Sequence, residues 1–393
     1  MKSNEGKLTN ALIHLGRDNQ TTGRSVNLPM HQTSTMLFNT LEEFEQAKSS
    51  RYDTGTLYYG RYGTPATFEL ESVMTQIEQG AGCVAVSSGL TACVIALMSF
   101  AKAGDHILVA DTVYGPTRAF CDNVLADYGV TTTYFDPLLG SAIETLMQEN
   151  TRVVFFEAPG STTFEVPDIP SISATAKAFG AISILDGTWA TPLYCQPLAL
   201  GVDVVVHSGS KYLSGHSDAM LGFIVSGSKE NHLKTRKMSL SIGDRVGGSD
   251  VFLALRGLRT LSVRLRTHAE NTLKCIAWLA QQPEVVRILH PAHPDCPGHE
   301  FWQRDFCGVT GLFSVVFQPG SDEKIRAMIN QLSLFGIGLS WGGFESLAIP
   351  VDPTPFRSAT KWQEEGPMVR FHIGLEDADS LILDLKNGFR LLK

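Results

Sequence analysis

The residue best suited to carry chemistry in this sequence is a lysine that follows a predicted buried strand. Residues 204–206 (VVV) form an apolar, β-branched run, and the chain continues through Ser208 and Ser210 to Lys211. Open α/β sheets bind their ligands at the carboxyl ends of such strands. A lysine amine at that edge is suited to a Schiff base with pyridoxal phosphate (PLP), and the neighbouring hydroxyls can bind an anion.

A second predicted strand brings an acid to the same edge of the sheet. Residues 182–185 (ISIL) form another apolar run, which ends at Asp186. A carboxylate there can keep the pyridine nitrogen of PLP protonated, and an Asp partner with a Schiff-base lysine is a recurring pair in PLP sites. Each residue alone has an ordinary explanation, because lysines after strands are usually solvated and strand-end aspartates usually cap helices. The combination favours the cofactor site.

Three short motifs extend this pattern in order along the chain: DGT at 186–188, SGSKY at 208–212 and GHSD at 215–218. Their order and spacing resemble the cysteine and methionine metabolism family of PLP-dependent enzymes, and the resemblance runs from about residue 58 to residue 391. It implies an α/β fold of the aspartate aminotransferase type. The large, PLP-dependent transferase-like domain would hold a mostly parallel seven-stranded sheet, followed by a smaller C-terminal α/β domain.

The resemblance also implies a set of cofactor contacts. Backbone amides and hydroxyls would bind the phosphate, and a tyrosine would stack on the ring. Besides Lys211 and Asp186, these residues are Gly89, Leu90, Ser208, Ser210 and Tyr114. The predicted strand, glycine turn and apolar helix over 83–101 suit a phosphate, because amides at a helix N-terminus point outward. Alone, the turn would be an ordinary connector and Tyr114 a turn aromatic.

The segment YYGRYGTP at 58–65 resembles a family element that crosses a dimer interface. The resemblance implies that Tyr59 is a catalytic residue near the active site, and that Arg61 binds the phosphate of the neighbouring subunit. Arginine suits this task because its planar fork gives bidentate hydrogen bonds. An isolated arginine on a loop would instead be solvated. The implied active unit is a dimer, and the usual family state is a homotetramer of two such dimers.

The segment LSWGGFESL at 339–347 resembles the family signature S-x-G-G-x-E-S-L. The resemblance implies that Ser340 and Trp341 contact substrate, and that Arg370, farther along the chain, pairs with the substrate α-carboxylate. A tryptophan at 341 is typical of the branch that cleaves at the β-carbon. Leu339 departs from the pattern, because that branch carries a tyrosine there, so recognition of the far end of the substrate stays open.

The implied reaction is cleavage of the β carbon–sulfur bond of L-cystathionine, which gives L-homocysteine, pyruvate and ammonia on the route to methionine. The amine of Lys211, once displaced by substrate, would act as the base, and Tyr114 would be a further catalytic residue. The alternatives are γ-elimination or γ-replacement, cysteine desulfhydration, and a ligand sensor without turnover. Pyruvate marks β-cleavage and 2-oxobutyrate marks γ-cleavage, so product analysis separates β-cleavage from γ-cleavage.

The composition of the chain excludes several other classes of protein. The chain has 393 residues, 43% of them hydrophobic, and a formal charge of −8, which indicates a globular protein with no basic surface for nucleic acid. Seven cysteines without a C-x-x-C pair, no apolar leader and no membrane-length run predict a cytoplasmic protein with reduced thiols. The pattern HxxHxxCxxH at 290–299 matches no standard zinc spacing, so we expect no metal.

The predicted elements divide the chain into three parts. Residues 1–60 form an arm that contacts a neighbouring subunit, with one short helix at 41–48. Residues 61–255 form the PLP domain, where strands and helices alternate as in a parallel sheet. Residues 256–393 form the smaller domain. Helices are predicted at 64–79, 90–101, 117–128, 142–149, 172–179, 323–334 and 377–391, and strands at 83–86, 106–110, 130–135, 153–157, 221–225, 285–289, 312–317 and 368–373.

Overall fold

The computed structural model describes residues 2–17 and 24–393, which contain two sheets. The first has seven strands in the order β1-β7-β6-β5-β4-β2-β3. Strand β7 is antiparallel to both neighbours and the other pairs are parallel, which confirms the predicted sheet. The strands are β1 (Gly82–Val86), β2 (His106–Ala110), β3 (Thr131–Phe135), β4 (Thr151–Glu157), β5 (Ile182–Asp186), β6 (Val204–Ser208) and β7 (Gly222–Ser226).

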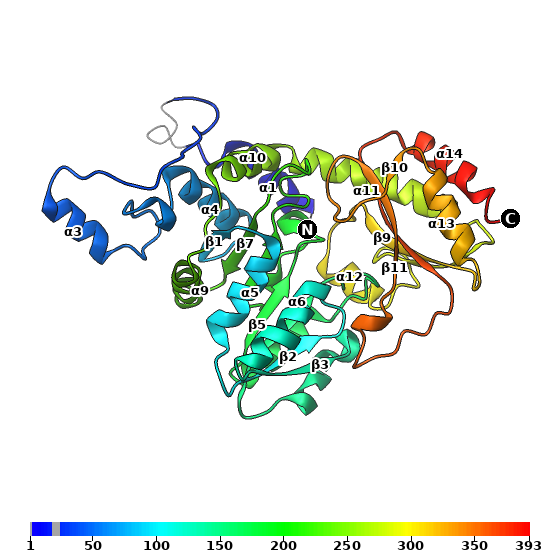
Figure 1. The fold of residues 1–393 in the computed structure, drawn as a ribbon, viewed down its shortest axis with the longest axis horizontal. Helices are drawn as coiled ribbons and strands as arrows, with labels where there is room; N and C mark the ends of the chain where they lie inside the picture. Colours follow the sequence, from blue (N-terminus) through cyan, green and yellow to red (C-terminus); the bar gives the residue numbers. More distant parts are fainter. Residues whose placement is uncertain (1, 18–23) are drawn as a thin grey trace.

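The second sheet has five strands and its own apolar core, in the C-terminal part of the chain (Figure 1). Its order is β10-β11-β12-β9-β8, with antiparallel pairs except β10 with β11. The strands are β8 (Val285–Leu289), β9 (Leu312–Phe317), β10 (Phe335–Gly336), β11 (Ser346–Val351) and β12 (Met368–His372). The smaller α/β unit is therefore present. The boundary predicted at 255 falls inside helix α10 (Gly248–Arg259), and the exact division stays a prediction.

Helices cover both sheets, and their starts follow ordinary capping rules. Helix α4, for example, begins after Thr64, whose hydroxyl accepts the backbone N–H of Thr67, and Pro65 occupies the first turn. Besides α10, the α-helices are α1 (Lys2–His14), α3 (Leu41–Ser49), α4 (Pro65–Ile77), α5 (Gly89–Phe100), α6 (Gly115–Ala119), α7 (Ile169–Ala178), α8 (Thr191–Tyr194), α9 (Lys229–Ile242), α11 (Leu261–Leu279), α12 (His299–Asp305), α13 (Asp322–Gln331) and α14 (Ala378–Phe389).

Two segments predicted as helices over the first sheet are helical, but not α-helical throughout. The helix expected at 117–128 is α6 followed by a π-helix, η2 (Phe120–Leu125). The helix expected at 142–149 is a 3₁₀ segment, η3 (Pro137–Leu146), which bends at Gly140. Hydrophobic spacing alone does not separate these helix types, because they differ by less than one residue per turn over such short runs.

The prediction of an extended arm over residues 1–60 was wrong for its first part. Helix α1 packs on its own chain, with Leu8 and Leu12 buried on one face. The side chain of Arg259 in α10 donates to the carbonyl oxygens of Leu12 and Leu15 at 2.6 and 2.7 Å. The segment around α3, by contrast, extends away from both sheets (Figure 1).

Within the two described ranges, no helix is long and apolar enough to cross a membrane. The same ranges contain no group of three or more His, Cys, Asp or Glu side chains that could hold a metal ion. The histidines of the 290–299 pattern instead bond to backbone: His290 lies 3.4 Å from the carbonyl oxygen of Thr310, and His299 lies 2.7 Å from that of Pro291.

Candidate active site

Lys211 lies directly after β6, at the carboxyl edge of the first sheet, as predicted. Its Nζ donates a hydrogen bond to the hydroxyl of Ser340 and lies 5.3 Å from the centre of the Trp341 ring. Burial, and to a smaller extent the charge of Arg370, lower the pKa of Lys211 to about 8, against an opposing effect of Asp186. A lysine with this pKa can lose its proton near neutral pH, which a nucleophile or base requires.

Asp186 ends β5 and is buried beside β6. Its Oδ1 accepts hydrogen bonds from the N–H and hydroxyl of Thr188 at 3.0 and 2.5 Å. Its Oδ2 has the thiol of Cys93 at 3.8 Å, a long contact that leaves this oxygen able to accept a stronger donor. Burial raises the pKa of the Asp186 carboxyl, so a protonated ring nitrogen would supply the positive partner that favours its ionised form.

The residues predicted to bind the phosphate lie where the start of α5 meets the end of β6. A Cβ added at Gly89 would lie 2.5 Å from the Cβ and Oγ of Ser208, so the close approach requires glycine. The N-terminal amides of α5, which include those of Gly89 and Leu90, open beside this serine. The hydroxyl of Ser210 is engaged with the backbone of Leu221, whose N–H lies 3.1 Å and whose carbonyl lies 3.2 Å away.

Tyr114 stands at the start of α6, and its position is fixed by an acid that sequence analysis missed. Its backbone N–H donates to Oε2 of Glu157 at 2.7 Å, and Glu157 ends β4 in register with Asp186. Burial raises the pKa of Glu157 well above its usual range, and the charge of Asp186 raises it further. The sequence signal that could have identified Glu157 is its position at the end of a predicted strand, next to the strand that ends at Asp186.

Ser340, Trp341 and Arg370 come from the second sheet and its loops, so the site lies between the two sheets. Arg370 on β12 donates to the carbonyl of Ser340 at 3.3 Å. A Cβ added at Gly342, where φ is +87°, would lie 2.7 Å from the backbone N of Tyr212 and 2.9 Å from the carbonyl carbon of Lys211. This loop therefore lies directly against the backbone of the lysine turn.

A buried histidine, also missed, supports this loop. The Nε2 of His372 on β12 lies 3.1 Å from the backbone N of Gly342 and 3.2 Å from the carbonyl of Gly343. Burial lowers the pKa of His372 well below its usual range, so the ring is neutral and can accept the Gly342 N–H. His372 was visible in the sequence beside Arg370, but nothing local connected it to a loop thirty residues away.

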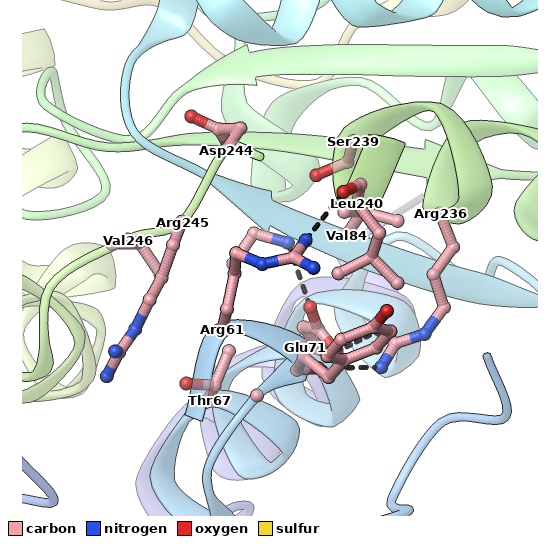
Figure 2. A pocket seen from close by; sticks show the side chains of 13 residues that line it. Arg61, Thr67, Glu71, Val84, Arg236, Ser239, Leu240, Asp244, Arg245 and Val246 are labelled. Atoms are coloured by element: carbon pink, nitrogen blue, oxygen red, sulfur yellow. Dashed lines mark hydrogen bonds and ion pairs between the residues drawn. The ribbon is translucent and has the colours of Figure 1, made fainter. Parts of the chain in front are cut away.

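Within the described part of the chain, Tyr59 and Arg61 make their contacts away from this group of residues. The guanidinium of Arg61 donates to the carbonyl of Leu240 at 2.6 Å. It lines a different pocket, beside the buried ion pair of Arg236 with Glu71 at 3.3 Å (Figure 2). Tyr59 forms an isolated bridge with Thr35 and is 42% exposed. Their predicted roles require a second copy of the chain.

These features together define a PLP-dependent enzyme with the aspartate aminotransferase type of fold: an amine of lowered pKa, a buried carboxylate, helix N-terminal amides beside a serine, and an arginine from the second sheet. A family comparison agrees with this class. Residues 9–390 match the model described as Cys/Met metabolism PLP-dependent enzyme, and the chain belongs to that family.

Individual relatives cover nearly the whole chain. Cystathionine beta-lyase MetC of Escherichia coli K12 is 41% identical over 389 residues, which is 98% of each protein. An L-alanine/L-glutamate racemase of Wolbachia pipientis wMel is 35% identical and covers 95% of this chain and 94% of its own. The crystal structure of cystathionine gamma-lyase from Lactobacillus plantarum complexed with L-serine has a TM-score of 0.89 at 29% identity, covering 98% and 99% of the two chains.

Proposed function

We propose that this protein is a PLP-dependent carbon–sulfur β-lyase that cleaves L-cystathionine to L-homocysteine, pyruvate and ammonia, a step towards methionine. The observation that carries the proposal is the Lys211 amine, which lies within electrostatic reach of both Asp186 and Arg370. The choice of substrate is supported by the name of the E. coli relative and by Trp341 beside the lysine.

The residues around the first sheet would hold the cofactor. When bound, PLP takes up the negative charge that develops at the substrate α-carbon. Lys211 would hold it covalently, Asp186 would keep its ring nitrogen protonated through Oδ2, and Tyr114 would cover one ring face. The phosphate would be bound by the amides of Gly89 and Leu90, by the hydroxyl of Ser208, and by the hydroxyl of Ser210 when its O–H turns from the Leu221 carbonyl to the phosphate.

The chain's own groups then orient the substrate and move its protons. The guanidinium of Arg370 binds the α-carboxylate by charge-assisted hydrogen bonds. The freed amine of Lys211, guided by the Ser340 hydroxyl, takes the α-proton. The bond between the β-carbon and sulfur breaks, and the sulfur leaves with the electron pair. Burial raises the pKa of the Tyr114 phenol, which therefore stays protonated and can donate to the departing sulfur.

Product analysis of the purified holoenzyme tests the proposed function. L-Cystathionine should yield pyruvate and homocysteine in equal amounts, without 2-oxobutyrate. Formation of 2-oxobutyrate would favour γ-elimination, and rapid pyruvate formation from L-cysteine alone would favour desulfhydration. The Wolbachia relative makes amino-acid racemisation a second candidate, and formation of D-alanine from L-alanine at a rate above that of cystathionine cleavage would favour it. If neither oxoacid nor D-amino acid forms, the enzyme assignment fails.

The pKa of Lys211 predicts a pH dependence of turnover. The amine accepts a proton only when uncharged, so the rate should rise with pH through about 8 and level off above it. Arg370 helps to lower this pKa, so Arg370→Met should move the rising limb to higher pH at saturating substrate. Arg390→Met, which removes an exposed arginine at the end of α14, is the control and should leave the limb in place. If the rate of Arg370→Met rises over the same pH range as that of the wild type, the assignment of Lys211 as the base is contradicted.

We also propose that the active unit is a dimer, and that dimers pair into a homotetramer. The segment around α3 exposes apolar side chains that its own chain does not cover: Leu37 is 94% exposed and Leu41 is 75% exposed. Such a segment is stabilised when a second subunit covers it. Sedimentation velocity should give the mass of four chains, and a monomeric mass would contradict the proposal.

Mixing two inactive variants tests whether Arg61 acts across the dimer interface. In a hybrid dimer of Arg61→Ala with Lys211→Ala, one site has its own intact lysine and receives an intact arginine from the other subunit. Random pairing of an equal mixture makes about half of the dimers hybrids, each with one complete site of two, so the refolded mixture should regain roughly a quarter of the wild-type activity. If Arg61 served its own chain, no hybrid site would be complete and activity would not return.

We propose a cytoplasmic location, since six of the cysteines, at 83, 93, 121, 195, 275 and 296, are buried as free thiols. Fractionation of cells that produce the protein should recover cystathionine-cleaving activity with cytoplasmic markers. Recovery in an oxidising compartment, with the cysteines paired, would contradict this location.

A further inference from the structure

Asp111 is a buried carboxylate that the proposed mechanism leaves without a task. It follows β2, and its side chain is fully inaccessible. Its oxygens accept the backbone N–H groups of Ser358, Ala359 and Thr360 at 2.9, 3.1 and 2.9 Å. The hydroxyls of Ser358 and Thr360 add bonds of 3.2 and 3.0 Å. Three successive amides therefore converge on one carboxylate that lies 247 residues earlier in the chain.

Two arginines anchor the same segment on either side of Asp111. Arg118 on α6 donates to Asp111 at 2.9 Å and also to the carbonyl of Phe356 at 2.7 Å. Arg357 donates to Glu165, which lies in the chain between β4 and α7. Charge-assisted bonds of this kind are among the strongest in proteins, and here the ion pairs are largely buried. The segment 356–360 is held to the first sheet over its whole length.

This segment joins the two halves of the proposed substrate site. It lies between β11 and β12 of the second sheet, and in Figure 1 the orange chain after β11 leaves that sheet and descends beside the cyan elements around β3 and α6. Asp111 stands three residues before Tyr114. Phe356 also lies against the neighbouring position, because a Cβ added at Gly115 would be 3.1 Å from its ring.

We propose that Asp111 is a positioning residue for catalysis, which holds segment 356–360 against the first sheet. It thereby fixes the position of Tyr114 on the first sheet relative to Arg370 on the second. Arg370 and Tyr114 are within electrostatic reach of each other, so both sides of the substrate depend on this spacing. The inference rests on the proposed function, since it assigns those two residues to the substrate. A misplacement of about 1 Å can cost about 10²-fold in rate.

The bonds between Asp111 and segment 356–360 should persist at working pH. Burial alone would raise the pKa of the Asp111 carboxyl, but the amides of Ser358 and Thr360 and the side chain of Arg118 outweigh it and hold the pKa below its usual range. A carboxyl with a depressed pKa keeps its charge, and the bonds that depend on that charge, until the pH falls through the folded-state value.

The test compares Asp111→Asn with Asp384→Asn in the holoenzyme. Asp384 is a matched control, because it is also a buried carboxylate that accepts backbone amides, those of Ser333 and Leu334, but it lies on α14. We expect Asp111→Asn to lower kcat/KM for cystathionine by about 10²-fold at unchanged cofactor content. We also expect faster hydrogen exchange of the amides at 358–360, and Asp384→Asn should show neither change.

A second variant keeps the test decisive if Asp111→Asn folds poorly. Phe356 is 45% exposed, so Phe356→Ala should fold normally and lower kcat/KM in the same direction by a smaller factor. The inference is overturned if both variants keep wild-type kcat/KM, or if Asp111→Asn loses activity only in proportion to lost cofactor. Hydrogen exchange needs no turnover. A wild-type protein without lyase activity would therefore refute the proposed function, while the bonds of Asp111 to segment 356–360 could still be tested by hydrogen exchange.

Discussion

The Lys211→Ala variant is expected to cleave cystathionine about 10³-fold more slowly than the wild-type enzyme, or to be inactive. General-base catalysis alone is typically worth about 10²–10⁴-fold, and this variant also loses the covalent attachment of the cofactor. The removed amine is the one that burial and Arg370 bring to a pKa of about 8. Steady-state kinetics with cofactor added in excess measure the effect.

Two further measurements separate the role of this amine from a loss of folding. Lys177→Ala removes an exposed lysine on α7 and should keep wild-type turnover. A small primary amine such as ethylamine, added to Lys211→Ala, should restore part of the activity because it can take the α-proton in place of Nζ. Full pyruvate formation by Lys211→Ala without added amine would refute the assignment.

The Asp186→Asn variant is expected to lose about 10³-fold in kcat. Two opposite unit charges about 4 Å apart attract each other by about 4 kcal/mol at the effective dielectric of protein sites, and the loss of an attraction of that size corresponds to about three powers of ten in rate. Asparagine keeps the shape and the bonds to Thr188 but lacks the charge. The bound cofactor should therefore remain while its visible spectrum changes.

Asp203→Asn is the matched control for this prediction. Asp203 also accepts a backbone N–H and a hydroxyl, both from Ser183 near the start of β5, at 2.9 and 2.7 Å. It lies at the opposite end of the strand from Asp186, so its replacement should lower stability without lowering the kcat of the folded enzyme. Equal losses of kcat in the two variants would show that the charge at 186 has no special role.

The local sequence pattern was sufficient to predict the strands of the first sheet, because most of them are buried on both faces. Apolar runs such as the one at β6 predict strands without knowledge of their partners, and Lys211 and Asp186 follow from where two of those runs end. The start of α4 was equally readable, since a threonine cap and a proline at the first turn are local signals.

The missed features depend on groups that are distant in sequence. Helix α1 carries few apolar residues, and its packing against α4 and α10 shows why Leu8 and Leu12 are buried. Glu157 becomes part of the site only through the register of β4 with β5. The bonds from Asp111 to Ser358 span 247 residues, so no window of the sequence could reveal them.

Reduction of the holoenzyme with sodium borohydride, followed by digestion and mass spectrometry, tests the central claim most directly. The reaction fixes a cofactor carried on a lysine amine as a stable secondary amine. The account predicts that the pyridoxyl group is found on the peptide that contains Lys211. A pyridoxyl group on another lysine, or a holoenzyme that yields no modified peptide, would contradict it.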